Sequence, residues 1–226
     1  MREALNKAQK KGVSPKGTAI FPYLNKPDVK YDAEGVYTTA LALEGDDIEE
    51  MEKRIAPILR AAKEAAETEG KKKRKKAKEA DMPFRPELTR VDPESDEIPE
   101  ETGRVLFRFK SKASGKRKDG SLWERKVALF DSKGKPMNAL VGGGSVLKIS
   151  YTLVPWVNPK LEYGVKLQLE AVQVITLGAM GGNQDAEGFG FGEEEGGFEA
   201  DENDAPFDAD DAGDPGAQPP EEDEDF

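Results

Sequence analysis

Charge is unevenly distributed along the chain, and this limits how much of it can fold. Residues 178–226 contain 18 Asp and Glu and no Lys or Arg, whereas residues 1–177 contain 34 basic and 27 acidic side chains. A glycine-rich segment with one sign of charge buries too little apolar surface to offset its ordering entropy, roughly 1–2 kcal/mol per residue. We therefore expect residues 178–226 to be a disordered acidic tail that follows a folded domain.

Two absent residue types restrict the chemistry of the chain. It contains no cysteine and no histidine. Disulfides, thiol catalysis and cysteine zinc sites are therefore excluded, and the commonest general base and metal ligand are missing. We expect a protein that is not an enzyme and that uses no cofactor or metal. No apolar run approaches the ~20 residues that span a bilayer, and no signal sequence is evident. We expect a soluble, intracellular protein without a membrane partner.

Alternating apolar and polar residues predict a mainly β domain. The alternation favours strands over residues 35–43, 104–112, 121–130, 145–154 and 163–177. Between the first two, residues 48–66 carry an apolar stripe at helical spacing, with Asp46 and Asp47 as candidate N-caps and Pro57 as a predicted kink or start. Five strands with one inserted helix predict a small barrel closed from an antiparallel sheet.

Cations and aromatic residues alternate on the predicted strands. Arg108, Lys110 and Lys112 share one face, and Phe107 and Phe109 share the other. Single-stranded nucleic acid requires cations for its phosphates and flat rings for its bases, each stacked base contributing ~1–3 kcal/mol. The same alternation also describes any half-buried strand. We therefore favour core packing for Phe107 and Phe109.

Further candidates for this interface lie elsewhere in the sequence. Lys148 and Tyr151 lie near each other on one strand, and Trp156 follows its end; Trp156 fits a core or a stacking role equally well. A basic run places seven cations in the eight positions 71–78. Like charges at this density repel one another and favour a solvated segment, which could contact phosphates or act as a localisation signal.

The chain ends in five acids and an aromatic residue. These are Glu221, Glu222, Asp223, Glu224, Asp225 and Phe226. Such an end suits docking into a basic, apolar pocket on a partner, or competition with nucleic acid for the protein's own basic surface. A purely solubilising tail is the alternative.

Several stretches, in this order, resemble the single-stranded DNA-binding proteins of T7-type bacteriophages. They are YLNKPD (23–28), GVY (35–37), DMPF (81–84), FRFK (107–110), DSKGK (131–135), GGGS (142–145), YTLVP (151–155), VKLQLE (165–170) and DEDF (223–226). The resemblance implies an OB-fold over residues 20–177, a flexible segment over 1–19 and a disordered acidic tail. It also implies a homodimer that binds single-stranded DNA without strong sequence preference, in the cytoplasm of an infected bacterium.

The resemblance further implies roles in DNA replication, recombination, repair and strand annealing. The terminal Phe226 would contact the phage DNA polymerase and primase-helicase. Base stacking is carried onto Trp156, with Tyr31 and Tyr151 as further aromatic candidates. The backbone-cation role is carried onto Lys110 and the basic run 71–76. Together with the strand candidates, the cations expected to contact phosphates are Arg108, Lys110, Lys112, Lys148, Lys71, Lys72, Lys73 and Arg74. Asp32 and Glu34 depart from the family pattern, which has more cations in this first loop.

Two other functions fit part of the sequence. An acidic-tailed interaction protein would bind basic partners through its tail and would ignore oligonucleotides. A metal-dependent nuclease would need a carboxylate cluster on one face of the strands, and the predicted strands offer none.

Overall fold

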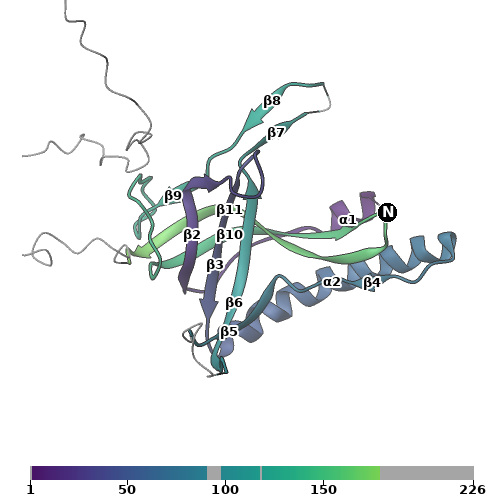
Figure 1. The fold of residues 1–226 in the computed structure, drawn as a ribbon, viewed down its shortest axis with the longest axis horizontal. Helices are drawn as coiled ribbons and strands as arrows, with labels where there is room; N and C mark the ends of the chain where they lie inside the picture. Colours follow the sequence, from purple (N-terminus) through teal and green to yellow (C-terminus); the bar gives the residue numbers. More distant parts are fainter. Residues whose placement is uncertain (1, 91–97, 118, 179–226) are drawn as a thin grey trace, which may run out of the picture. The chain divides into compact units, whose positions relative to one another are not determined.

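The computed structural model describes residues 2–90, 98–117 and 119–178. All of them belong to the first of two units, Met1–Asn183. The elements are α1 (Arg2–Ala8), β1 (Lys10–Val13), β2 (Gly17–Asp28), β3 (Val36–Leu43), α2 (Asp46–Lys73), β4 (Lys78–Glu79), β5 (Phe84–Leu88), β6 (Glu101–Lys112), β7 (Ser114–Lys116), β8 (Leu122–Glu124), β9 (Ala128–Phe130), β10 (Val146–Val157) and β11 (Glu162–Thr176) (Figure 1).

Five strands pair in a closed ring. Going round it, β2 pairs with β3, β3 with β6, β6 with β11, β11 with β10, and β10 with β2. Figure 1 shows β2, β3 and β6 side by side. Four of these pairings are antiparallel, but β6 and β11 run parallel. The mainly β prediction is confirmed, whereas the wholly antiparallel sheet is corrected by this parallel contact.

The predicted strands match the ring in four places. Strands β3, β6, β10 and β11 lie where the alternation predicts them. The predicted strand over residues 121–130 is instead two short strands: β8 forms a separate hairpin with β7, and β9 pairs with β11. The fifth strand of the ring is β2, which the alternation misses because its pairing is irregular after Ile20.

The first nineteen residues also differ from the predicted flexible segment. They contain α1, β1 and the start of β2. Strand β1 adds to β10, with Lys10 opposite Leu153 and Val13 opposite Ser150. Leu5 of α1 is buried. Backbone hydrogen bonds to β10 explain why β1 is structured. A strand of four residues can form these bonds without a long apolar run.

Helix α2 runs without interruption through Pro57. The proline lacks the N–H that would bond to the carbonyl of residue 53, but it is exposed, so water can reach that carbonyl. The N-cap residue is Gly45, and the predicted caps Asp46 and Asp47 lie in the first turn. There their charge favours the positive end of the helix dipole.

The core fills the inside of the ring. Phe107 and Phe109 have no exposed surface, which confirms their core assignment, and Phe109 packs against Tyr151 with ring centroids 5.4 Å apart. Met51, Ile55 and Ile58 of α2 join the same cluster. The predicted disorder of residues 178–226 lies outside the described residues, apart from Gly178. Within the described part of the chain, no helix is both long and apolar enough to cross a membrane.

Candidate nucleic-acid interface

The cations of β6 point outward along the ring. Arg108, Lys110 and Lys112 are exposed, and they alternate with the buried Phe107 and Phe109. This follows from the two-residue period of a strand, which sends successive side chains to opposite faces. The predicted grouping of the three cations on one face is therefore what the structure shows.

Strand register extends this row of side chains in both directions. Lys110 lies between Thr38 of β3 and Gln168 of β11; beyond them, Tyr23 pairs with Thr38 and Thr152 with Gln168. On the far side of Thr152, β1 contributes Lys11. Lys166 lies on β11 two residues before Gln168, on the same side of the strand. We call Lys11, Arg108, Lys110, Lys112 and Lys166 the cationic face.

Charge on this face is only partly neutralised. The pKa of Lys166 is lowered by burial, and then by the nearby charges of Lys110, Lys112 and Arg125. Among the described residues, neither Lys110 nor Lys166 has a carboxylate within ion-pair distance. A phosphate placed between them would relieve their mutual repulsion.

The edges of the face are different, because carboxylates lie there. Lys112 pairs with Glu34 and lies 3.9 Å from Asp32. The hydrogen bond to Glu34 is the main cause of the raised pKa of Lys112. These two acids lie in the loop between β2 and β3, so Lys112 is less available for phosphate than Lys110.

Glu170 organises the other edge. It accepts a hydrogen bond from Thr152 at 3.0 Å and from Gln168 at 3.0 Å, and it pairs with Arg125. Burial raises its pKa, but these hydrogen bonds outweigh burial and the net pKa is lowered. Glu170 therefore stays ionised and holds Arg125 in place beside the face.

Trp156 lies on the same side of β10 as Thr152 and is half-buried. It pairs with Gly164 of β11, and a Cβ added at Gly164 would lie 2.9 Å from the indole. The indole therefore lies flat against the backbone of β11, and the glycine makes room for it. Its outer surface remains accessible, as a stacking role requires.

Tyr151 does not belong to this surface. It is 1% exposed, its ring contacts Phe109, and its hydroxyl lies 3.3 Å from Nη1 of Arg54. A base cannot reach it, so its predicted stacking role is wrong. The reason is strand parity: Trp156 lies five positions after Tyr151, an odd offset, which places the two rings on opposite sides of β10.

The remaining single candidates lie apart. Tyr31, in the loop between β2 and β3, is 87% exposed, with Nζ of Lys30 at 5.3 Å from its ring centroid. Its ring is accessible, and its predicted stacking role stays a prediction. Lys148 points outward but lies eight residues from Trp156 along β10, about 26 Å at ~3.3 Å per residue.

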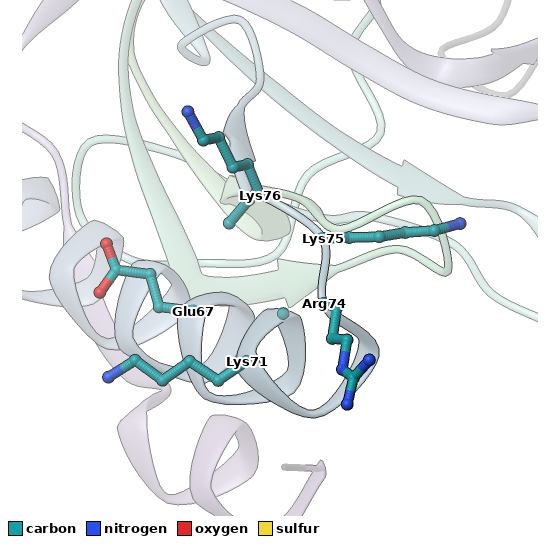
Figure 2. A pocket seen from close by; sticks show the side chains of 7 residues that line it. Glu67, Lys71, Arg74, Lys75 and Lys76 are labelled. Carbon is teal, nitrogen blue, oxygen red and sulfur yellow. The ribbon is translucent and has the colours of Figure 1, made fainter.

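Lys71, Lys72, Lys73 and Arg74 form the C-terminal end of α2. With Lys75 and Lys76 they are called here the helix-end cluster. Nζ of Lys72 and Lys73 lie 3.7 Å and 3.3 Å from carboxylate oxygens of Glu69. A shallow pocket of about 440 Å³ is lined by Lys71, Arg74, Lys75, Lys76 and Glu67 (Figure 2). In Figure 2 the labelled cations point away from one another.

The helix-end cluster is not part of the cationic face. Ala62 and Ala66 of α2 pack against Tyr163, which lies on the opposite side of β11 from Gly164 and Lys166. The structure therefore separates two groups of cations that the sequence offers as one set.

Sequence reasoning missed four residues of the exposed surface. Lys166 had a signal, because it alternates with buried residues on its strand. Lys11 had none, because its position depends on the pairing of β1 with β10. Phe21 and Tyr23 lie on the missed strand β2 and are 70% and 47% exposed.

The predicted partner-binding residues Glu221–Phe226 lie outside the described residues. In the described part of the chain, no group of three or more acidic side chains is arranged to hold a metal ion.

A ring of strands with cations on one outer side, and half-exposed aromatic rings beside them, defines a class of protein whose surface suits a flexible polyanion with flat bases. Sequence comparison makes the assignment specific. The model of the family described as single-stranded DNA-binding protein of bacteriophage T7 matches residues 16–177, and the chain belongs to this family.

Individual relatives agree with the family assignment. The single-stranded DNA-binding protein of Escherichia phage T7 is 32% identical over 200 residues, which cover 79% of this chain and 81% of that protein. The protein of the same description from Enterobacteria phage T3 is 31% identical over 193 residues, covering 76% and 78%. The crystal structure of gp2.5, the single-stranded DNA-binding protein encoded by bacteriophage T7, matches with a TM-score of 0.61, covering 85% of this chain and 100% of that one.

Proposed function

We propose that the chain binds single-stranded DNA without strong sequence preference, with phosphates on the cationic face and bases on Trp156 and Tyr31. The observation that carries this proposal is the register that brings Lys110 and Lys166 to the same outer side as Trp156. No carboxylate of residues 2–90, 98–117 or 119–178 pairs with either lysine. The relatives named above are single-stranded DNA-binding proteins, which supports the same reading.

We further propose that the ring of strands is an OB-fold. In that fold, a five-stranded barrel binds oligonucleotides on the face of its second and third strands and on the loops after its first and fourth strands. In sequence order the ring strands are β2, β3, β6, β10 and β11. The second and third are therefore β3 and β6, and β6 carries part of the cationic face. The loop after β2 holds Tyr31, and Trp156 lies just before the loop after β10.

Single strands are favoured over duplex for a physical reason. The bases of a duplex are already stacked on one another, so they gain nothing from an exposed indole, whereas unstacked bases do. If four to six phosphates are neutralised, log K falls against log salt with a slope of roughly −3 to −4.

Fluorescence anisotropy of a labelled oligo-dT tests the proposal directly. The full-length protein is titrated at several salt concentrations, with an equal-length duplex as competitor. We expect tight binding to the single strand, the salt slope above and weak competition by the duplex. A slope near zero would refute the electrostatic account, and equal competition would refute the preference for single strands.

We propose that the acidic segment 178–226 competes with DNA for the cationic face and recruits the phage DNA polymerase and primase-helicase. The charges support competition, because residues 178–226 carry 18 acids while residues 1–177 carry an excess of seven cations. Removing residues 200–226 is then expected to tighten oligo-dT binding and to abolish polymerase recruitment. Unchanged DNA affinity after truncation would count against competition. If only the tail binds other proteins and the body ignores oligonucleotides, the acidic-tailed interaction protein becomes the better account.

Family membership supports a wider proposal. We propose that the chain acts as a homodimer, in the cytoplasm of an infected bacterium, and anneals complementary strands during replication, recombination and repair. Sedimentation of the full-length and truncated proteins tests the dimer. Renaturation of complementary strands, followed with a duplex-specific dye, tests annealing. A rate no faster than spontaneous renaturation would refute the annealing activity.

A further inference from the structure

Strand β2 contains a bulge at an aromatic residue. Ile20 pairs with Ala40 and Tyr23 pairs with Thr38, so Phe21 and Pro22 together oppose Thr39 alone. The backbone of Phe21 has φ of 48°, in the left-handed region that a bulky L-residue rarely adopts. Bulges of this kind redirect a side chain and are common beside functional sites.

The strain at Phe21 brings no gain in core packing. The side chain is 70% exposed, and Tyr23, two residues later, is 47% exposed. Large aromatic residues are normally buried, so two exposed rings on one bulged segment need another explanation. Strained backbone that packing does not reward is found mainly at binding and catalytic sites.

Strand register places these rings beside the cationic face. Tyr23 pairs with Thr38, which pairs with Lys110. Ile20 pairs with Ala40, which pairs with Arg108, so Phe21 follows directly on that row. The guanidinium of Arg90 lies 5.7 Å from the centroid of the Phe21 ring and adds a further cation.

Trp156 lies at the other end of the same surface. Going round the ring by way of β11, β6 and β3 leads from Trp156 on β10 to Phe21 and Tyr23 on β2. The direct pairing of β10 with β2 lies at the other end of β10, at Val146 and Leu147. Four strand spacings of ~4.8 Å make roughly 19 Å across the strands. The path also runs along them, because Trp156 pairs with Gly164 while the row of Lys110 and Tyr23 meets β11 at Gln168. The cations Lys166, Lys110 and Arg108 therefore lie between two aromatic sites.

We propose that Phe21 and Tyr23 form a second base-stacking site, which binds bases of the strand whose phosphates lie on Arg108 and Lys110. This inference rests on the single-stranded DNA binding proposed above. The bound strand would then follow a path across the sheet between Trp156 on β10 and the bulge on β2. In this arrangement the bulge turns the Phe21 ring toward the bases.

A Phe21→Gly variant separates folding from binding. Glycine adopts a φ of +48° without strain, and the side chain that it removes is mostly exposed, so the melting temperature should stay equal or rise. DNA affinity should instead fall by about 5- to 140-fold, the loss of one stacked base. A Phe21→Trp variant keeps a flat ring and should bind as the unchanged protein does.

Two controls make the comparison specific. Leu122 is also 70% exposed but lies on the separate β7–β8 hairpin, so Leu122→Ala should leave DNA affinity unchanged. An abasic oligonucleotide has phosphates but no bases, so the full-length protein and Phe21→Gly should bind it equally. Tyr23→Ala should weaken oligo-dT binding in the same way, and it gives a second test if Phe21→Gly alters folding.

The outcomes distinguish the two proposals. If the unchanged protein binds oligo-dT and both Phe21→Gly and Tyr23→Ala bind it equally well, the second stacking site is refuted and the proposed function stands. If Phe21→Gly weakens abasic and oligo-dT binding alike, the residue acts through something other than stacking, and the inference again fails. If the unchanged protein binds no oligonucleotide, the proposed function fails.

Discussion

The cationic face and the helix-end cluster show two ways in which a chain can arrange positive charge. In the sequence the helix-end cluster is much the denser, because every residue from 71 to 76 is a cation. In the structure the side chains of Lys71, Arg74, Lys75 and Lys76 point away from one another (Figure 2). Lys72 and Lys73 lie beside Glu69. The cations of the face come from separate strands, yet they share one surface. Charge density along a chain therefore does not predict where charge converges in space.

The difference follows from the geometry of the two elements. Consecutive residues of a helix project in different directions, and only residues three or four apart are neighbours. Strands bring outward side chains together from ~4.8 Å apart, whatever their distance in sequence. Lys110 and Lys166 are brought to one surface in this way, and the side chain of Lys166 is half-buried there. Electrostatic attraction to a phosphate is stronger there than at an exposed helix end.

The largest effect is expected when the centre of the face loses its charge. The double variant Lys110→Gln with Lys166→Gln should weaken oligo-dT binding on the order of 50-fold at 50 mM salt, because two phosphate contacts are lost. The salt slope should also become shallower by about 1.4. Anisotropy titrations at four salt concentrations measure both. An unchanged slope would mean that neither lysine contacts a phosphate.

Stacking at the end of the face should have the next largest effect. Trp156→Ala should make oligo-dT binding ~1–3 kcal/mol less favourable, because one base loses the ring on which it stacks. Tyr151→Phe is the matched aromatic control on the same strand: DNA affinity should not change, while unfolding costs about 1 kcal/mol less because the Arg54 hydrogen bond is lost. Oligo-dT titration and thermal unfolding measure the two effects. Equal DNA affinity of folded Trp156→Ala would make this ring structural only.

Four of the five ring strands could be predicted from the sequence, and the reason for the exception is physical. Strands β3, β6, β10 and β11 keep a regular two-residue alternation, because one side of each faces the core. In β2, the bulge at Phe21 and Pro22 shifts the alternation, so Leu24 is buried where an unbroken pattern would expose it. The parallel contact between β6 and β11 depends on long-range topology, which local periodicity does not contain.

The candidate site was predictable to the same extent. Alternation within β6 identified Arg108, Lys110 and Lys112 as one group, since a single strand suffices for that inference. The predicted stacking role of Tyr151 was wrong because it followed from the proximity of Tyr151 to Lys148 in sequence. Tyr151 is an odd number of positions from Lys148, so the two side chains lie on opposite sides of β10. Lys11 joins the face only through the pairing of β1 with β10. Residues on one strand can thus be grouped from sequence, whereas grouping across strands requires the register.

A smaller effect should appear at alkaline pH. Burial and the neighbouring cations lower the pKa of Lys166 below its ordinary value of 10.5. As the pH rises toward 10.5, Lys166 in the free protein loses its proton early, and DNA affinity should fall by up to about 8-fold at 50 mM salt, the contribution of one contact. Folding stability should rise over the same window, because the unfolded chain there holds the additional proton.

Lys166→Arg is the matched control for this pH dependence. Arginine keeps its charge throughout the window, so the fall in affinity should move to higher pH. Oligo-dA is the suitable probe, because its bases do not ionise in this range. Identical affinity profiles for the two proteins would show that Lys166 is not the titrating group.

The smallest effect is expected at the helix-end cluster, although its charge is the densest in the sequence. Lys72→Gln with Lys73→Gln should change oligo-dT affinity by no more than about 2-fold, because both lysines are exposed and near Glu69, and α2 packs on the other side of β11 from the face. The variant removes as many charges as the double variant of Lys110 and Lys166, so net charge is matched and only position differs. Titration of both variants in parallel therefore isolates position. If they weaken binding equally, total charge governs the affinity, and the distinction between the two regions is refuted.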